Sequence, residues 1–168
     1  MTKQEFLKTF RMSAEERRLW DEAIERDAAL ATESERPLVT EINATGWKIE
    51  SVWDLVNFHT DHAALAPILI EHLSNDYHPK IKMAIARALI TAKVRSEACS
   101  KALVAELELA LSESGGQWEG VQQSLTHALA KLAHPSIAHE VEALASRCKG
   151  TFLSEDLNEA IKRVKRVK

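Results

Sequence analysis

The chain has 168 residues, of which 45% are hydrophobic and 28% are charged, and it contains only five glycines and four prolines. This scarcity of turn-forming residues is typical of helical proteins, and the length is that of one domain, so we expect an all-α protein built around one core. The formal net charge of −3 at pH 7 argues against a general nucleic-acid coat, which normally carries a clear basic excess.

The first predicted helix begins at Ser13, because Ser13 and Glu16 have the S-x-x-E spacing of a capping box. We expect this helix to extend to about Thr32. Asp27 interrupts its apolar stripe and charged residues fill most other positions, so the helix is predicted to lie on the outside of the bundle. The stripe consists of Trp20, Ala23, Ile24, Leu30 and Ala31.

A second, short helix is predicted between Pro37 and Gly46. Proline suits the first helical turn, where its missing N–H is not needed, and glycine suits the left-handed residue that closes a helix. Ser51 and Asp54 then repeat the capping spacing. This pair predicts a further helix of one to two turns, from Val52 to Asn57.

After residue 60 the chain contains six apolar stripes at helical spacing, joined by short connections. Helices joined in this way pack as antiparallel neighbours, and three hairpins are the simplest arrangement. Pro67 is expected to bend or delay the first of them, and Ser96 and Ser154 are expected to cap later ones. We therefore divide the chain into an N-terminal helical subdomain, residues 1–60, and a helical-repeat region, residues 61–168, which together form one compact domain.

The segment from Tyr77 to Ala92 begins with a proline and has almost no face suited to solvent. A helix of this kind must be covered on two sides, and a stack of helical hairpins provides that cover without a sheet. One apolar stripe consists of Ile81, Ala84, Ile85, Ala88 and Leu89, and the opposite side contains Met83, Ala86 and Ile90.

A family resemblance is carried by residues 78–92, HPKIKMAIARALITA, which look like the second helix of a HEAT repeat in their early proline and apolar positions. The resemblance covers roughly residues 61–148, and a second HP-x-I start at His134 suggests internal repetition. The segment ESVWDLVN and the L-x-P-I-L-I-E-H-L helix after it are similar to those of small uncharacterised bacterial proteins with HEAT-like repeats. The resemblance implies a short α-solenoid of about three HEAT-like hairpins with a scaffold or binding role. A minority branch of the family consists of HEAT-like DNA glycosylases that handle alkylated bases.

Polar side chains crowd the short helix at 52–57 and the turn that follows it. Asp54 and Asn57 are one helical turn apart and can face the same way. In the alternative structural interpretation, Asp54 caps its own helix, Trp53 packs in the core and Asn57 ends the helix. We predict a binding surface here, extended by the basic flank of the 79–92 helix. The predicted binding residues are Trp53, Asp54, Asn57, His59, His62, Lys80 and Arg87.

Catalytic and metal motifs are absent from the sequence. His59, Asp61 and His62 are three potential ligands within four loop residues, which is not the convergent arrangement of a zinc site. No histidine occurs in H-E-x-x-H or E-x-x-H, and there is no Gly-rich phosphate loop, nucleophile elbow or Ser/His/Asp signature. We therefore predict no catalytic residue, no metal and no cofactor, although groups distant in sequence can still converge in space.

A nucleic-acid function would need a basic groove, aromatic platforms and, for base excision, a carboxylate. The aromatic platforms could come from Trp47 and Trp53, and the carboxylate from Asp54. The basic residues are less suitable, because they fall on both flanks of the 79–92 helix. Lys80 and Arg87 lie on one flank, and Lys82 and Lys93 lie on the other.

The C-terminal KRVKRVK is expected to end an amphipathic helix, where the helix dipole favours cations.

The cellular setting is predicted from cysteines and apolar runs. Cys99 and Cys148 are far apart in sequence and have no metal-ligand spacing, so we expect both to be small core residues. No signal-like segment opens the chain, and no apolar run approaches the roughly 20 residues of a membrane span. We expect a cytoplasmic protein without membrane contact.

Taken together, these features favour a non-enzymatic module that binds another protein on a concave helical-repeat surface. Two alternatives stay open: an immunity-type partner that neutralises a toxin or nuclease, and a HEAT-like DNA-binding or base-excising protein. The identity of the partner, the oligomeric state and the way residues 1–60 dock on the repeats are not determined by the sequence.

Overall fold

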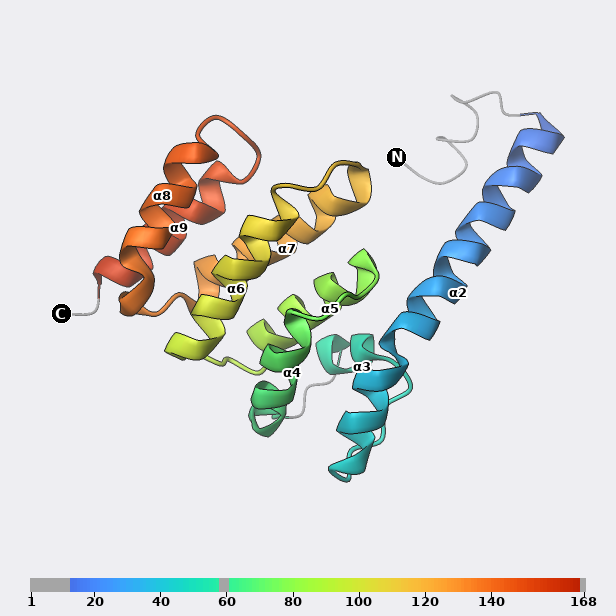
Figure 1. Ribbon diagram of the computed structural model, residues 1–168, viewed down its shortest axis with the longest axis horizontal. Helices are drawn as coiled ribbons and strands as arrows, with labels where there is room; N and C mark the ends of the chain where they lie inside the picture. Colours follow the sequence, from blue (N-terminus) through green and yellow to red (C-terminus); the bar gives the residue numbers. More distant parts are fainter. Residues whose placement is uncertain (1–12, 58–60, 167–168) are drawn as a thin grey trace.

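The computed structural model describes residues 13–57 and 61–166. Within these ranges the protein is all-helical and has no β-strand, which confirms the predicted all-α class (Figure 1). None of the described helices is both long and apolar enough to cross a membrane. The helices are α2 (Ala14–Ala44), α3 (Val52–Asn57), η1 (Ala63–Leu65), α4 (Ala66–Leu73), α5 (Pro79–Thr91), α6 (Glu97–Ala110), α7 (Gly116–Leu132), η2 (Pro135–Ile137), α8 (Ala138–Arg147) and α9 (Ser154–Lys165), where η denotes a 3-10 helix.

Helix α2 corrects the prediction of two separate helices before residue 50, because it is one continuous helix of 31 residues with Pro37 inside it. A proline at this position removes the hydrogen bond to the Glu33 carbonyl, but both residues are exposed, so water can satisfy that carbonyl. Leu38 and Ile42 are fully buried on the stripe that also contains Ala31. Burial of this shared stripe explains why the helix continues through the proline.

Among the predicted capping serines, Ser13 and Ser96 are confirmed and Ser154 is wrong. Ser13 and Glu16 form the reciprocal capping box at the start of α2. Ser96 Oγ accepts a hydrogen bond from the backbone N–H of the third residue of α6 at 3.1 Å. Ser154 is the first residue of α9 rather than its cap, and its hydroxyl donates to the Cys148 carbonyl at 2.7 Å.

From α3 onward, alternate helices pack against each other. Helix α5 contacts α3 and α7, and α7 also contacts α9, while α4 contacts α6. In Figure 1, α6 lies in front of α7 and α8 lies in front of α9. Because α5 has neighbours on several sides, Ala84, Ile85, Ala86, Ala88 and Leu89 are all fully buried. This confirms that the 79–92 helix has to be covered over more than one face.

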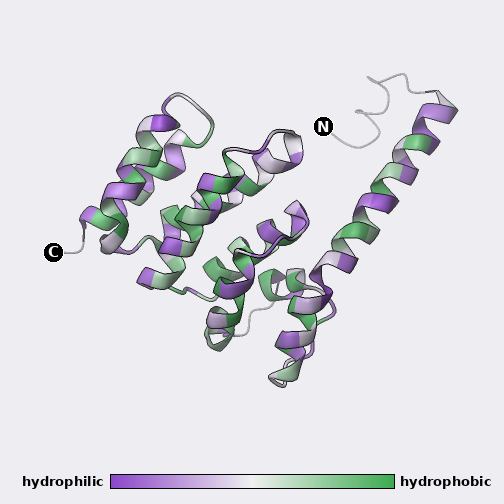
Figure 2. Cartoon of the chain, in the orientation of Figure 1, coloured by the Kyte–Doolittle hydropathy of each residue, from purple (hydrophilic) through white to green (hydrophobic). Residues whose placement is uncertain are grey.

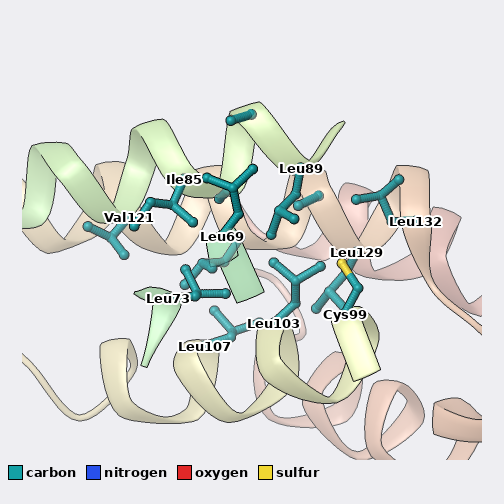
Figure 3. Packing of buried hydrophobic residues seen from close by; sticks show 14 of the residues in the cluster. Leu69, Leu73, Ile85, Leu89, Cys99, Leu103, Leu107, Val121, Leu129 and Leu132 are labelled. Carbon is teal, nitrogen blue, oxygen red and sulfur yellow. The ribbon is translucent and has the colours of Figure 1, made fainter. Parts of the chain in front are cut away.

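One buried hydrophobic cluster extends from Ala31 to Val164. It therefore includes residues on both sides of the boundary predicted at residue 60. Figure 3 shows its central part, where Leu69 of α4, Leu89 of α5 and Leu103 of α6 point toward one another.

Among the described residues, one ion pair has both of its side chains buried. It joins Lys82 of α5 to Glu106 of α6. The Lys82 ammonium lies 2.6 Å from Glu106 Oε1 and also donates to the Leu73 carbonyl at 3.3 Å. The two side chains are only 6% and 2% exposed. Burial raises the pKa of Glu106 above its ordinary value, although Lys82 opposes this shift. Lys82, predicted from the sequence to lie on a basic flank of this helix, is thus a core residue.

Both cysteines are buried, as predicted, and this should make them slow to react. Burial raises the pKa of Cys99 to about 12 and also raises the pKa of Cys148. Since the thiolate is the reactive form, at about pH 8 we expect iodoacetamide to modify Cys99 far more slowly in the native protein than in urea. Mass spectrometry after a timed quench measures both sites. Equal labelling of Cys99 with and without urea would contradict its burial.

Candidate functional site

A groove with a volume of about 440 Å³ crosses four of the helices, α3, α5, α7 and α9. Its size is within the range of ligand-binding clefts in proteins. The lining combines two apolar side chains with polar and charged ones. The residues that line it are Val56 of α3, Arg87, Ile90 and Thr91 of α5, Gln123, Ser124 and His127 of α7, and Asp156 of α9.

Arg87 is the cation that lines this groove, and an aromatic ring holds it. The carbon at the centre of its guanidinium group lies 5.4 Å from the ring centroid of Trp53, which is a cation–π contact. Arg87 is exposed and Trp53 is half-buried. Because the ring supports one face of the guanidinium group, the N–H donors at its edge stay available to an anion.

Helix α3 is short, so its position depends on side chains that bind its first turn. Glu35 of α2 is buried, and its carboxylate accepts hydrogen bonds from Ser51 Oγ at 2.9 Å and from the Val52 backbone N–H at 3.0 Å. The Asp54 carboxylate accepts hydrogen bonds from the backbone N–H groups of Glu50 at 2.9 Å and Ser51 at 3.1 Å. Two carboxylates at the start of α3 also complement its dipole. These contacts tie α3 to α2 and thereby fix the tryptophan under the arginine.

His62 lies behind the groove rather than on its surface. Its Nε2 is 3.1 Å from both the Ala88 carbonyl and Thr91 Oγ1, and its ring meets Trp47 edge-on at 6.3 Å. The side chain is 1% exposed. His62 therefore helps to position Thr91, which lines the groove, and cannot contact a partner directly.

The structure brings together part of the binding surface that the sequence predicted. Trp53 and Arg87 are in contact at the edge of the groove. Asp54 caps its own helix, as the alternative structural interpretation had it. Asn57 is the last residue of α3 and is exposed.

Of the other predicted residues, Lys80 does not line the groove. Lys80 lies at the start of α5, where its ammonium is 2.6 Å from Asp27 Oδ2 of α2. His78 Nε2 lies 3.0 Å from the other oxygen of the same carboxylate. Lys80 thus anchors α2 to α5. His59 lies outside the described residues.

The half of the groove that α7 and α9 supply is not among the residues predicted from the sequence. Gln123 and His127 are one turn apart on α7, on the polar side of a helix whose sequence also has an apolar stripe. That spacing was a usable signal for a second polar surface. Asp156 has no comparable signal, because only the packing of α9 on α7 brings it near His127, with Asp156 Oδ1 at 3.5 Å from His127 Nδ1.

The groove contains the three residue types of a hydrolase triad, Ser124, His127 and Asp156, but not its geometry. A triad requires a hydrogen bond from the serine hydroxyl to the histidine, and no such bond joins Ser124 to His127 in the described structure. Ser124 is also buried, at 4% exposure. In this groove, Ser124 is therefore not an activated nucleophile.

Other chemical roles find little support in the described part of the chain. Residues 13–57 and 61–166 contain no group of three or more His, Cys, Asp or Glu side chains placed to hold a metal ion. Most of the cations around α5 are engaged within the protein. Lys80 pairs with Asp27, Lys82 with Glu106, Arg87 lies over Trp53, and Arg95 Nε donates to the Ala133 carbonyl at 3.3 Å.

Comparisons of the chain with protein-family models, with curated proteins and with solved structures found no match. A function can therefore be proposed only from the residues and their geometry.

Proposed function

We propose that this protein is a HEAT-like α-solenoid that binds a segment of another protein in the groove across α3, α5, α7 and α9. The observation that carries the proposal is that four helices, far apart in sequence, contribute side chains to one open surface with apolar and charged parts. The packing of alternate helices supports the solenoid, since stacked hairpins produce such a row.

The lining suits a peptide or helix better than a nucleic acid. Val56 and Ile90 provide an apolar area for an anchoring side chain, and Arg87 is the cation available beside it. A guanidinium group held on an aromatic ring can bind a carboxylate through two parallel hydrogen bonds. We therefore expect the partner to present an apolar residue and an acidic residue close together, as on one face of an amphipathic helix.

Photo-crosslinking tests this proposal. A photoreactive amino acid is introduced at Gln123, which is exposed in the groove, and at Glu108, which is exposed on α6 outside the groove. We expect Gln123 to crosslink to a specific protein in cells, and Glu108 not to do so. The identified protein is then purified. If it is a toxin or nuclease, the protein described here acts as its immunity-type neutralising partner.

Charge reversal in the groove then provides the quantitative measurement. Binding of the purified partner should weaken about tenfold or more in Arg87→Glu, which corresponds to at least about 1.4 kcal/mol. Lys101→Glu makes the same charge change at an exposed position on α6 and should leave the affinity unchanged. Equal affinities for wild type and Arg87→Glu, or crosslinks at Glu108 alone, would contradict the proposal.

A further inference from the structure

The groove across α3, α5, α7 and α9 has two ends that differ in chemistry. Its apolar lining residues, Val56 of α3 and Ile90 of α5, lie at the same end as the cation Arg87. The opposite end is formed by α9, which contributes the carboxylate of Asp156, and the lining that α7 supplies between the two ends is polar. Hydrophobic and hydrophilic residues are interspersed along the helices of this row (Figure 2). A segment that lies along the groove therefore meets different chemistry at its two ends.

Both charged side chains keep hydrogen-bonding capacity for a partner. Arg87 is exposed, and Trp53 covers one face of its guanidinium group while the N–H donors lie at the edge. The Asp156 side chain is 32% exposed, and its Oδ1 is 3.5 Å from His127 Nδ1, which is longer than a usual hydrogen bond. The groove thus presents donors for an anion at one end and acceptors for a cation at the other.

Helix α7 sets the distance between these two charges. It contacts both α5 and α9 and lies between them (Figure 1). Packed helices are about 8–10 Å apart, so the axes of α5 and α9 are roughly 16–20 Å apart. Two residues on one face of a helix are about 16 Å apart when they are separated by about 11 positions, or three turns. A helix of ordinary length can therefore reach from Arg87 to Asp156.

We propose that the partner segment is an α-helix that lies across this row in one direction, with an acidic residue on Arg87 and a basic residue on Asp156. This inference rests on the function proposed above. An apolar residue of the helix contacts Val56 and Ile90, the acid lies about one turn from it, and the base lies about 11 residues beyond the acid. The reversed orientation would place like charges together at both ends, so the groove also selects the direction of the helix.

An extended segment suits this groove less well than a helix does. Extended peptides gain much of their affinity by adding a strand to the edge of a sheet. Residues 13–57 and 61–166 contain no strand, so the part of the chain that the structure describes offers no such edge. What the groove offers instead is side chains from four helices, which match the side chains on one face of a partner helix.

Selection from a phage-displayed library tests the proposal, with 20-residue peptides of random sequence on a helix-forming framework and the full-length protein as bait. Clones count as groove binders when Arg87→Glu weakens their binding about tenfold or more and Lys101→Glu does not. Relative to the unselected library, we expect groove binders to be enriched in three features. These are an apolar residue, an acid about one turn from it, and a base about 11 residues beyond the acid, read from either end of the peptide.

Variants of Asp156 measure the contribution of the α9 end. Asp156→Lys should weaken groove binders about fivefold, because it replaces an attraction by a repulsion. Glu140→Lys makes the same charge change at an exposed position on α8 and should leave their affinity unchanged. Asp156 is in the first turn of α9, where an acid complements the helix dipole, so thermal unfolding checks that the variant is folded. If Asp156→Lys is unfolded, Asp156→Asn takes its place.

A second selection uses the charge-swapped variant Arg87→Glu/Asp156→Lys. We expect it to return peptides in which the acid and the base have exchanged places, while the apolar residue stays at the same end. The same charge order with wild type and with the charge-swapped variant would overturn the inference.

The remaining outcomes separate this inference from the function on which it rests. If groove binders carry no base at a fixed distance from the acid, or bind Asp156→Lys and Glu140→Lys equally well, the inference is overturned while the groove still binds a helical segment. If no selected clone is sensitive to Arg87→Glu, both the inference and the proposed function are contradicted.

Discussion

Lys82→Met is expected to lower the free energy of unfolding by about 3–5 kcal/mol. The substitution keeps most of the length of the side chain but removes the ammonium that lies 2.6 Å from Glu106 Oε1. Glu106 is 2% exposed, and its other oxygen accepts no hydrogen bond from the described residues. The variant therefore contains a buried carboxylate without a counter-ion. Urea unfolding at neutral pH measures the difference.

Replacing both partners separates the cost of an unpaired charge from the cost of lost packing. Lys82→Met/Glu106→Leu removes both charges, and we expect its stability to be close to that of wild type or higher. Lys101→Ala, which breaks an exposed ion pair with Glu97, should change stability little. If the single and double variants were equally unstable, the loss would come from packing and not from the orphaned carboxylate.

The pH dependence of the Lys82→Met deficit gives a further test. Burial already raises the pKa of Glu106 in the wild-type protein, and Lys82 opposes that shift. Without the cation, the pKa of Glu106 in the folded state should rise further above its value in the unfolded chain. Protonation then stabilises the folded variant as the pH falls, so the deficit should be smaller at about pH 5 than at about pH 8. A deficit independent of pH would contradict this explanation.

Features that depend on neighbouring residues in the chain could be predicted from the sequence. The all-α class, the capping box at Ser13 and the cap at Ser96 are local, because each depends on side chains within one helical turn. The burial of α5 around most of its circumference was also predictable, since apolar residues on two sides leave few alternatives.

Features that depend on packing between distant segments could not be predicted in the same way. From the sequence, Pro37 is expected at the first turn of a new helix. Only the burial of Leu38 and Ile42 explains why α2 continues without a break at this proline. Lys82 and the exposed Lys80 are both lysines in the first turn of α5, and the sequence does not distinguish them. Lys82 is a core residue because Glu106 of the next helix pairs with it.

The candidate site shows the same division. Trp53 and Arg87 could be chosen from the sequence, one as an aromatic residue in a polar segment and the other as a cation on an apolar helix. That the two are in contact depends on the packing of α3 against α5. Their connection to His127 and Asp156 requires two further helix contacts, α5 with α7 and α7 with α9.

Leu89→Ala is expected to destabilise the protein by about 2–5 kcal/mol, because it opens a cavity where α5 meets its neighbours. Leu89 is fully buried, and Figure 3 shows it among Leu69, Leu103 and Leu129 from three other helices. The loss combines the transfer free energy of the removed atoms with a term for the cavity that they leave. The cost therefore depends on how far the surrounding helices can relax. Urea unfolding followed by far-UV circular dichroism measures the change.

Leu109→Ala is the matched control, since it removes the same atoms from an exposed site on α6. Leu109 is 60% exposed, so its truncation should change stability by no more than about 0.5 kcal/mol. The difference between the two variants isolates the contribution of burial from the difference in helix propensity between Leu and Ala, which both substitutions share. Similar losses in the two variants would mean that α5 is not enclosed by α3, α4 and α7. The row of helices that forms the groove would then lack its central support.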